Sequence, residues 1–571
     1  MKVLVIGGVA GGASAAARVR RLDASAEVVV LDRGDYVSYS NCSLPYYLSG
    51  TVESDEDLIM MWPENFRASH DIEVRVRNEA LAIDRERKCV TVRDLNSGDC
   101  YEENYDKLVL APGAAPIMPA SIQGIDRPNV FSLRTVNDAV RIREAIRADR
   151  DGAHVTVVGG GFIGIEMTEN LIEAGAKVTL VEGLDQILQP YDYDMVQTLQ
   201  KELQDHGVSV HLSTTLKEIG ETSVIVESGG KDFAIDTEYV VMAIGVTPET
   251  KLAKASGLEI GQTGGIRVDE NYQTNDPDIY AVGDVIEVTN LLTGLQQRLP
   301  LAGPAQKQAR AAADHICGVQ SRKGRSAGRV IGSSCIRVFG LNAASTGLNE
   351  KSAAAAGIDF DSVMIFPSDR VGIMPGANYM QFKLLFEKGT GRVLGAQAIG
   401  TGDTVMRVNV VATLISMGGK VEDLKDLELC YAPLYSTAKD VVNMAALVAG
   451  NVLDGSIRQV HVSDARKLVE EGAMIIDVRS PEEYEEGHLN GSVNIPLGQI
   501  RQRLDEIPKD VPVYLHCRSS QRSYYALCAL RGRGYENVMN ISGSFLGFSL
   551  YEYFNDVTGD RRPIVTRYNF D

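Results

Sequence analysis

Runs of apolar residues alternate with helical patterns in the first third of the chain. The segment "KVLVIGG" (residues 2–8) is typical of a buried strand, an Ala- and Arg-rich helical stretch follows, and "EVVVLD" (27–32) is a second strand. The same order recurs in "HVTVVGGGFIGIEMTENLIEAGAKVTLVE" (154–182). The pattern predicts two βαβ units of the nucleotide-binding kind. The later run "TNDPDIYAVGD" (274–284) indicates that the second unit is inserted inside the first.

Two further regions have patterns of their own. Between about residues 330 and 450, strand-like "MQFKLLFE" and helix-like "TVMRVNVVATLISM" predict a third domain. After the joint "VAGNVLDGSIRQV" (448–460), a small α/β pattern begins with "AMIIDVRSPEEYEEGH" and "VPVYLHCRSSQRS". Since 571 residues leave room for about four domains, we predict a fourth, appended domain.

The charge composition of the chain limits which classes of partner we expect. With 57 Lys and Arg against 76 Asp and Glu, the formal net charge is −19, which repels nucleic acid and anionic membranes unless a local patch reverses the sign. We therefore expect neither partner, and an anionic ligand would need a local cluster of cations. The N-terminal apolar run lacks the flanks of a signal peptide, and no run approaches the ~18 residues of a membrane span. We expect a cytoplasmic protein.

The cysteines indicate thiol chemistry. Eight are present, and they form neither a CxxC pair nor a zinc-binding spacing. We expect reduced thiols, one or two of them reactive, and no metal site.

Glycines mark both turns that follow the first strands. Gly7 and Gly12 fit the dinucleotide fingerprint, with Val9 at the middle position and Asp32 at the end of the next strand, so nucleotide binding is favoured over a plain strand-to-helix turn. The second fingerprint is complete, with Gly159, Gly161, Gly164 and the strand-end carboxylate Glu182. A pyrophosphate would lie on that helix N-terminus. Because Glu182 would repel a 2′-phosphate, we expect NADH to be preferred over NADPH.

Three further segments carry a family resemblance. "YDKLVLAPGAAP" (105–116), "AIGVTPET" (243–250) and "YAVGD" (280–284) are similar, in order, to segments of the FAD-dependent pyridine nucleotide-disulfide oxidoreductases. The resemblance covers roughly residues 1–450. It implies that the first unit holds FAD and the second NADH, and that Asp284 bonds the ribityl or phosphate region of the flavin. The other cofactor residues that it implies are Ala111, Gly113, Gly245 and Gly283.

The C-terminal motifs "AMIIDVRSPEEYEEGH" and "VPVYLHCRSSQRS" resemble a rhodanese domain, and the two resemblances together give a domain plan. The expected fold is α/β, with two Rossmann-like domains, an α+β dimerisation domain and a C-terminal α/β rhodanese domain. The expected domains are FAD-binding at 1–112 and 248–325, NADH-binding at 113–247, dimerisation at 326–450 and rhodanese at 456–571.

Cys42 lies in "SYSNCSLPYY" (38–47), which resembles the single-cysteine branch of that family. The position five residues on is Tyr47, so Cys42 must pair with oxygen-derived or sulfur-bearing chemistry brought to it. Oxidase and peroxidase relatives carry a histidine beside the glycines of the first turn, whereas this chain has Ala10, which disfavours peroxide chemistry. Pro45 suits the first turn of a helix whose N-terminal amides would stabilise a Cys42 thiolate; an inert buried cysteine is the alternative.

A basic face accompanies Cys42. Ser14, Arg18 and Arg21 are spaced 4 and 3 along the first helix, and without the resemblance a solvated surface explains them. In coenzyme A-disulfide reductases the matching face holds coenzyme A. Carried over residue by residue, the expected coenzyme A site comprises Ser14, Arg18, Arg21, Ser38, Asn41 and Lys439.

The segment "LCYAPLYSTAKD" (429–440) is similar to the dimer segment that reaches the partner's active site, with Tyr431 the residue expected near the sulfur. One element departs from the family. These reductases usually carry a tyrosine pair before Pro-Gly, where this chain has Ile373 and Met374. That departure weakens the case for a bulky symmetric disulfide as the substrate.

The C-terminal motifs "IIDVRSPEEYEEGHLNGSVNIP" and "HCRSSQRS" resemble a single rhodanese domain. Cys517 follows a strand and Arg522 lies five positions on, so the loop between them can direct its amides at the terminal sulfur of a persulfide. An inert buried cysteine is the alternative. Asp477 and Arg479 are expected to brace the domain, and His516 and His488 to be structural.

Together these features predict a homodimeric FAD enzyme that uses NADH to reduce persulfides or polysulfides, including coenzyme A persulfide, through Cys42. Cys517 would carry sulfane sulfur, with Arg522 and Tyr431 assisting the two sites. Two alternatives stay open. One is a coenzyme A-disulfide reductase with an independent sulfurtransferase domain, and the other is a sulfur-carrier or redox-sensing protein.

Overall fold

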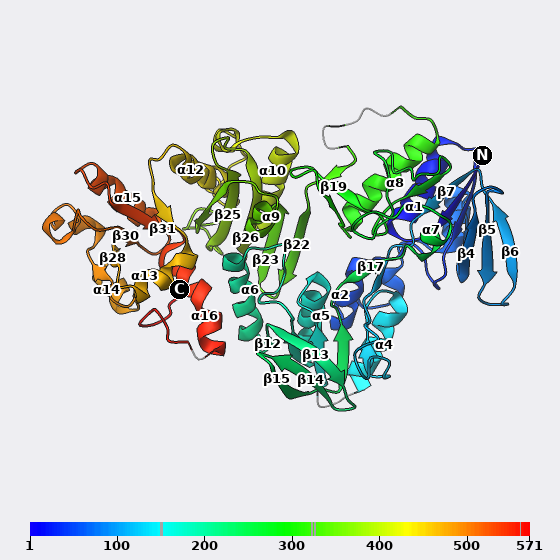
Figure 1. Ribbon diagram of the computed structural model, residues 1–571, viewed down its shortest axis with the longest axis horizontal. Helices are drawn as coiled ribbons and strands as arrows, with labels where there is room; N and C mark the ends of the chain where they lie inside the picture. Colours follow the sequence, from blue (N-terminus) through cyan, green and yellow to red (C-terminus); the bar gives the residue numbers. More distant parts are fainter. Residues whose placement is uncertain (149–151, 321–323, 325–326, 560, 571) are drawn as a thin grey trace. The chain divides into compact units, whose positions relative to one another are not determined.

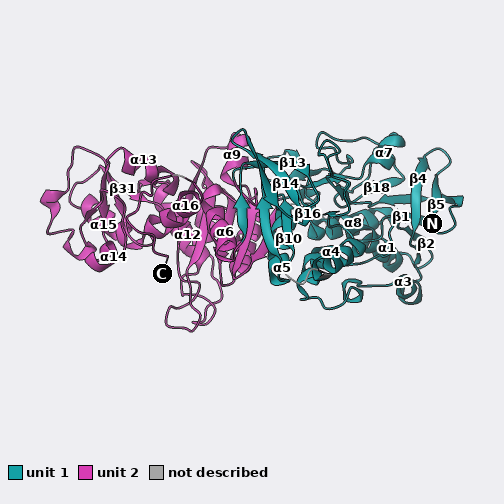
Figure 2. Ribbon diagram, turned by 90° about the horizontal axis from the view of Figure 1, so that it is seen from below, with its two compact units in different colours: residues 1–185, 208–330 teal, residues 186–207, 331–571 magenta. Residues whose placement is uncertain are grey.

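The computed structural model describes residues 1–148, 152–320, 324, 327–559 and 561–570, which form two compact units. Unit 1 comprises residues 1–185 and 208–330, and unit 2 comprises 186–207 and 331–571 (Figure 2). Each unit is larger than the predicted domains, whose boundaries stay predictions. The predicted boundary between 325 and 326 lies outside the described residues.

The first βαβ pattern opens a five-stranded parallel sheet in unit 1. Its strands follow the order β18-β7-β1-β2-β3. The bounds are β1 Lys2–Ile6, α1 Ala10–Leu22, β2 Glu27–Leu31, β3 Glu73–Arg75, β7 Lys107–Leu110 and β18 Ile279–Ala281. Since β18 pairs with β7 across the intervening chain, the predicted insertion of the second unit inside the first is confirmed.

The second βαβ pattern forms a matching parallel sheet, ordered β12-β11-β10-β16-β9. Its elements are β9 Val130–Phe131, β10 His154–Val158, α5 Phe162–Glu173, β11 Lys177–Val181, β12 Ser209–His211 and β16 Tyr239–Met242. The β10–β11 pairing joins five consecutive residue pairs, as the β1–β2 pairing does. The two nucleotide-binding units therefore have the same local geometry.

Small side chains let α1 lie close to its sheet. Ala15, Ala16 and Val19 are fully buried against strand valines, and Ala309 and Ala312 of α8 (Ala302–Ile316) join the same core. The remaining principal elements of unit 1 are α2 Leu44–Ser49, α3 Pro63–His70, α4 Val136–Ala148, α7 Lys251–Ala255, β4 Asn78–Asp84, β5 Cys89–Asp94, β6 Cys100–Asn104, β8 Ala114–Pro116, β13 Thr214–Ile219, β14 Ser223–Ser228, β15 Lys231–Asp236, β17 Val246–Pro248, β19 Val288–Asn290 and β20 Gln296–Gln297.

Unit 2 contains an antiparallel sheet ordered β22-β23-β26-β25-β24. The predicted strand "MQFKLLFE" is β25 (Met380–Glu387), and the predicted helix "TVMRVNVVATLISM" is α10 (Thr404–Met417), so both predictions are confirmed. Other bounds are β22 Ser333–Val338, β23 Leu341–Gly347, α9 Glu350–Ala355, β24 Phe360–Ile365, β26 Val393–Gly400, α11 Val421–Lys425 and α12 Val441–Leu453.

The C-terminal part of unit 2 is a parallel sheet ordered β27-β31-β30-β28-β29. Its elements are β27 Gln459–Val460, α13 Ala465–Glu470, β28 Met474–Asp477, α14 Pro481–Glu485, β29 Val493–Asn494, β30 Val513–His516, α15 Gln521–Arg531, β31 Val538–Ile541 and α16 Ser544–Thr558.

This C-terminal part is fixed to the rest of unit 2. Gln459 donates to the Ser362 carbonyl of β24 at 2.8 Å. α16 packs on α6 (Tyr193–Asp205; Figure 1). The Tyr193 and Tyr551 rings meet edge to face. In the part of the chain that the structure describes, no helix has both the length and the apolar character needed to cross a membrane.

Candidate functional site: two sulfur centres and two nucleotide turns

A cavity of about 630 Å³ lies at the carboxyl ends of the first sheet. This edge of a parallel sheet is where nucleotides bind. The predicted cofactor residues that line the cavity are Gly7, Asp32, Ala111, Gly113, Gly283 and Asp284, and Asn41 lines it beside them. The structure thus brings together residues from four separate stretches of sequence.

The first glycine turn is too tight for side chains at two positions. A Cβ on Gly7, whose φ is +97°, would lie 2.2 Å from the Ala111 carbonyl oxygen, and one on Gly12 would lie 1.7 Å from that of Gly7. Asp32 fixes the turn, because its carboxylate accepts the Gly8 amide at 2.7 Å and the Gly34 amide at 2.8 Å. The chain therefore holds an open, backbone-lined cradle, which fits the pyrophosphate and ribose of FAD.

The second turn repeats this construction. A Cβ on Gly159 (φ +110°) would lie 2.4 Å from the Ala243 carbonyl oxygen, and one on Gly164 would lie 1.8 Å from that of Gly159. Glu182 accepts the Gly160 amide at 2.6 Å and the Leu184 amide at 2.8 Å. These residues fit a second dinucleotide.

The middle position explains why Val9 is tolerated in the first turn. A Cβ on the equivalent Gly161 meets nothing within 4 Å, and both residues have negative φ, −101° for Val9 and −77° for Gly161. Within the polypeptide itself, neither sterics nor backbone conformation requires glycine there, so any requirement comes from the approach of the pyrophosphate. Gly245 (φ +119°) lies outside the cavity lining, and its carbonyl accepts the Ile117 amide at 3.0 Å.

Cys42 is exposed, on a short turn (Asn41–Ser43) just before α2. Pro45 lies in the first turn of α2, as predicted. The expected stabilisation of the thiolate by helix amides stays a prediction. In the protein alone, partial burial of the side chain raises the pKa of the Cys42 thiol, and the carboxylates of Glu166 and Asp284 raise it further.

Glu166 was missed by sequence reasoning. It lies on α5, directly after the second glycine turn, and α2 packs against α5. Burial, with a contribution from Glu169, raises the pKa of Glu166 to about 7. The larger cause, burial, depends on how α5 packs against other elements such as α2, and the local sequence signals only the smaller contribution of Glu169.

The basic face on α1 separates into different roles. Arg18 donates to Asp314 of α8 at 2.7 Å, so its guanidinium is tied to its own unit. Arg21 is exposed, and within the described residues it has no ion pair. Ser14 is half-buried on the same helix, and the Ser38 amide donates to the Gly8 carbonyl at 2.8 Å. Arg21 is therefore the cation of this face that is open to a ligand.

Tyr431 and Lys439 lie in an exposed segment of unit 2, and the Tyr431 side chain is 51% exposed. The loop that carries Ile373, 86% exposed, and Met374 lies beside this segment, since the Val371 amide donates to the Pro433 carbonyl at 3.3 Å.

Arg407 of α10 joins the loop to the segment. Its Nη2 atom donates at 2.9 Å to the Asp369 carbonyl of the loop and at 2.9 Å to the Tyr435 carbonyl of the segment. Arg407 is only 1% exposed; it also donates to the Asp403 carbonyl and pairs with the Asp440 carboxylate at 3.3 Å, and sequence reasoning missed it because most of its acceptors are backbone atoms.

Cys517 follows β30 directly, at the start of the loop that leads to α15, and is buried. Its amide donates to the Ser544 hydroxyl at 3.2 Å, and the Ser523 hydroxyl lies 3.6 Å from the sulfur. Ser520, in the loop that follows, has φ +73°, a left-handed conformation. The Ser523 hydroxyl thus contacts the sulfur and the Ser544 hydroxyl the Cys517 amide, while the arrangement of the loop amides around the sulfur stays a prediction.

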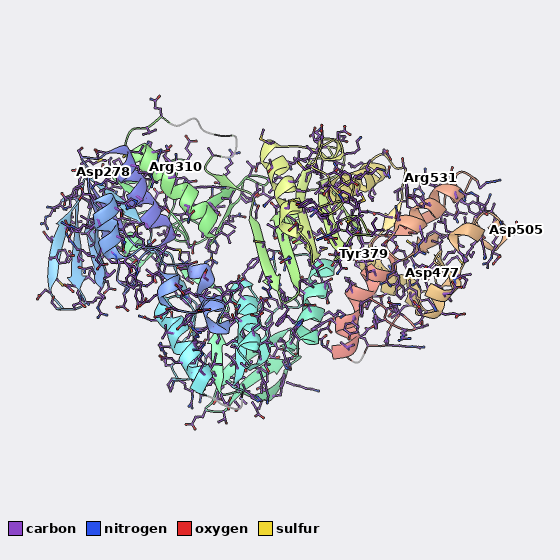
Figure 3. The ribbon with its side chains drawn as sticks, turned by 180° about the vertical axis from the view of Figure 1, so that it is seen from behind. Asp278, Arg310, Tyr379, Asp477, Asp505 and Arg531 are labelled. Atoms are coloured by element: carbon purple, nitrogen blue, oxygen red, sulfur yellow. The ribbon has the colours of Figure 1, made fainter. Side chains whose placement is uncertain are left out.

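Arg522 forms a bidentate pair with Glu483 of α14, at 2.6 and 2.7 Å. This pairing lowers the pKa of Glu483 to about 2, so that carboxylate stays charged. A cavity of about 380 Å³ opens here, lined by Arg479, Arg518 and Arg522, by Glu483 and Glu486, and by Tyr379, Ser519, Gln521 and Asn569. Tyr379 comes from the loop before β25, outside the predicted rhodanese domain (Figure 3).

Asp477, Arg479 and His516 form a buried brace, as expected. Arg479 donates to Asp477 at 2.6 Å and to the Gly487 carbonyl at 2.6 Å. Burial lowers the pKa of His516, whose ring packs edge to face against Phe548. His488 stacks on Tyr484 at 3.8 Å. Across the described residues, no three His, Cys, Asp or Glu side chains lie close enough together to hold a metal ion.

Comparison with known families matches three parts of the chain. Residues 1–309 match pyridine nucleotide-disulphide oxidoreductase, residues 334–441 match the dimerisation domain of that family, and residues 461–550 match a rhodanese-like domain. These matches confirm the resemblance and the fold class that the motifs predict.

Individual relatives cover almost the whole chain. The structure of reduced Bacillus anthracis CoADR-RHD is 40% identical, covering 97% of this chain and 98% of its own, with a TM-score of 0.92. An NAD-dependent persulfide reductase from A. fulgidus is 36% identical, covering 96% and 100%, with a TM-score of 0.89. Coenzyme A disulfide reductase of Staphylococcus haemolyticus is 30% identical over 443 residues, 78% of this chain and 98% of its own. The chain therefore belongs to the pyridine nucleotide-disulphide oxidoreductases, with a dimerisation domain and a C-terminal rhodanese-like domain.

Proposed function

We propose that the protein uses NADH to reduce persulfides or polysulfides, including coenzyme A persulfide, to hydrosulfide at Cys42, while Cys517 carries sulfane sulfur. The observation that carries this proposal is the pairing, in one chain, of a single exposed cysteine beside a dinucleotide cavity with a second cysteine inside a rhodanese loop. The names of the A. fulgidus and S. haemolyticus relatives, a persulfide reductase and a coenzyme A disulfide reductase, support the same chemistry.

The sulfur step belongs to Cys42. Its thiolate attacks the inner sulfur of coenzyme A persulfide, the S–S bond of the persulfide breaks, and hydrosulfide leaves. The product is a mixed disulfide between Cys42 and coenzyme A, and two electrons and one proton return it to the Cys42 thiolate and free coenzyme A. When bound, FAD supplies those electrons from NADH. Cys42 is not internally crosslinked, since all eight cysteines are free, so it is available for this exchange.

The cofactor roles rest on the two cradles. We assign FAD to the turn of Gly7 and Gly12 with Asp32, and to the cavity lining of Ala111, Gly113, Gly283 and Asp284. We assign NADH to the turn of Gly159, Gly161 and Gly164 with Glu182, and to Gly245. The predicted domain boundaries stand as part of this proposal.

The substrate roles are less evenly supported. Arg21 is the exposed cation available for coenzyme A phosphates. Ser14 lies on the same helix, and Ser38 and Asn41 lie just before Cys42 in the sequence. Arg18 is proposed to act indirectly, because Asp314 already holds it. Tyr431 and Lys439 would come from the second subunit of a homodimer, which the matched dimerisation domain supports. Eight free thiols favour a reducing compartment, the cytoplasm.

Coenzyme A-disulfide reduction is the second candidate, because relatives carry that name. The loop at Ile373 and Met374 counts against it, since an exposed Ile offers no hydroxyl to the second half of a symmetric disulfide. A redox sensor is the third candidate, and the complete second nucleotide turn counts against it because a sensor has no need of an NADH site.

The test is steady-state NADH oxidation with coenzyme A persulfide, inorganic polysulfide, coenzyme A disulfide and oxygen in parallel. We expect the persulfide and polysulfide to give the highest kcat/KM. A clear preference for coenzyme A disulfide would support the second candidate, and rapid turnover with oxygen would contradict the argument from Ala10. Absence of turnover with every sulfur compound would favour the sensor.

A further inference from the structure

The rhodanese cavity is lined by three arginines, and each of them already has a partner. Arg522 is held by both oxygens of Glu483, and Arg479 is held by Asp477. Arg518 donates to the Asn569 carbonyl at 3.1 Å. A dianion that enters the cavity therefore finds no arginine free of an acceptor, and two of the three are already neutralised by carboxylates.

A second carboxylate stands in the lining of the cavity. Glu486 is exposed and follows α14, and it accepts from the Asn569 side-chain amide at 3.2 Å. Unlike Glu483, it has no ion pair within the described residues. Glu486 shares this cavity and Asn569 with Arg518, and within the described residues the two form no ion pair.

Asn569, which donates to Glu486, lies in the C-terminal segment beyond the matched rhodanese region, which ends at residue 550. The C-terminal segment is fixed in place. The Thr566 amide donates to the His488 carbonyl at 2.9 Å. The Nζ atom of Lys201, on α6, lies over the Phe570 ring, 4.6 Å from the centre of that ring. Asn569 is thus delivered to the cavity by contacts on both sides of it.

We propose that Glu486, oriented by Asn569, is a specificity-determining residue that disfavours inorganic dianionic sulfur donors at Cys517 relative to singly charged or neutral organic donors. This inference rests on the proposed role of Cys517 as a sulfur carrier. Like charges brought together in a confined site cost binding energy, and that cost grows with the charge of the donor. A dianion is therefore penalised more than a monoanion of the same shape.

The transfer step differs between donors only in what leaves. With thiosulfate, the Cys517 thiolate attacks the sulfane sulfur, the S–S bond breaks, and sulfite dianion departs from a Cys517 persulfide. With methanethiosulfonate, the same bond forms and breaks, and the singly charged methanesulfinate departs. In both cases the donor's sulfane sulfur supplies the two-electron oxidation of Cys517 to the persulfide, so the step needs no external oxidant or reductant. The two donors differ mainly by one negatively charged oxygen replaced by methyl.

The test measures the loading of Cys517 from each donor, without NADH, by intact mass and by release of bound sulfane sulfur with cyanide. The Cys517→Ser protein is the blank. The variants are Glu486→Gln and Glu486→Lys, with Glu485→Gln as the matched control, because Glu485 is an exposed neighbour that does not line the cavity.

We expect the thiosulfate-to-methanethiosulfonate rate ratio to rise about fivefold in Glu486→Gln and further in Glu486→Lys, and to stay at the wild-type value in the control. Higher salt should raise the wild-type ratio, because the repulsion is screened. An unchanged ratio in both Glu486 variants overturns the inference while leaving the carrier role intact. If neither donor loads Cys517 in the wild-type protein, the carrier role itself is wrong.

Discussion

Cys42 lies exposed on a short turn, whereas Cys517 is buried. The hydroxyls of Ser523 and Ser544 and the pair of Arg522 with Glu483 all come from the rhodanese domain, and among the described residues only Tyr379 enters the lining of the cavity from outside it. At Cys42 the surroundings raise the thiol pKa, and carboxylates contribute. The comparison indicates that the reactivity of Cys42 depends on bound cofactor and substrate, whereas Cys517 is already in contact with polar groups of the protein.

The largest expected effect separates the two cysteines. Cys42→Ser should lower turnover with every sulfur substrate by at least about a thousandfold, because a serine hydroxyl stays protonated and is a poor nucleophile toward sulfur. Flavin reduction by NADH should persist, since hydride transfer does not use the thiol. Rapid-mixing spectra measure both steps.

The control is Cys100→Ser, which replaces another exposed cysteine of unit 1. Wild-type reoxidation of the flavin by persulfide in Cys42→Ser would show that the two cysteines are not divided as proposed.

Cys517→Ser should abolish sulfur transfer to an acceptor thiol but leave reduction of small persulfides within about threefold of wild type, because these donors reach Cys42 without loading the rhodanese loop. Sulfurtransferase and NADH oxidation assays on the same preparation give the two values. Cys528→Ser, an exposed cysteine of the same domain, should change neither. Loss of all turnover in Cys517→Ser would mean that every sulfur atom passes through the rhodanese site.

In the proposed cycle the Cys42 site depends on electrons from NADH bound at the second nucleotide turn, and the Cys517 site does not. Glu182→Gln should shift the NADPH-to-NADH ratio of kcat/KM toward NADPH by roughly tenfold, since it removes a charge that would face a 2′-phosphate. Sulfurtransferase activity serves as the internal control and should not change. If the wild-type enzyme already uses NADPH as well as NADH, Glu182 does not face the ribose.

A smaller effect is expected for the residues proposed to bind the phosphates of coenzyme A. Arg21→Ala should raise KM for coenzyme A persulfide about three- to tenfold while sparing inorganic polysulfide, which has no phosphates to bind. The same selectivity is expected for Lys439→Ala. Equal losses with both substrates would indicate that these residues only maintain the fold.

The smallest expected change is a shift in pH dependence. The Glu166 carboxylate raises the pKa of the Cys42 thiol, so Glu166→Gln should move the alkylation profile of Cys42 toward lower pH. Iodoacetamide rates between pH 6 and 10, roughly the range in which a thiol titrates, measure this shift. The pH profile of alkylation at Cys517 should not change. A profile displaced toward higher pH would show that Glu166 assists ionisation instead.

Glu166 also gives a stability consequence with a definite sign. Its pKa is about 7 in the folded protein and 4.5 as the ordinary value, so the folded state binds more protons between these limits. Stability from this group is therefore present at low pH and falls as the pH rises through that window. The unfolding free energy of the wild type, relative to that of Glu166→Gln, should therefore decrease as the pH rises from 4.5 to about 7.

Local patterns determined much of this protein. Apolar strands followed by glycine turns specify the two βαβ units, because tight strand-to-helix packing leaves no room for a Cβ at Gly12 or Gly164. The Cys517 loop is also local, since its cysteine, arginine and Ser523 lie within seven consecutive residues. In each case the chemistry depends on neighbours in the chain, and the sequence alone is sufficient to predict it.

Tertiary structure alone decided the partners that lie far apart in the sequence. Arg18 meets Asp314 across 296 residues and Arg522 meets Glu483 across 39, so two cations that look alike in the sequence are already paired. The raised pKa of Cys42 and the entry of Tyr379 and Asn569 into the rhodanese cavity likewise depend on packing between separate elements. Charge pairing and desolvation depend on distance in space, which a local pattern does not encode.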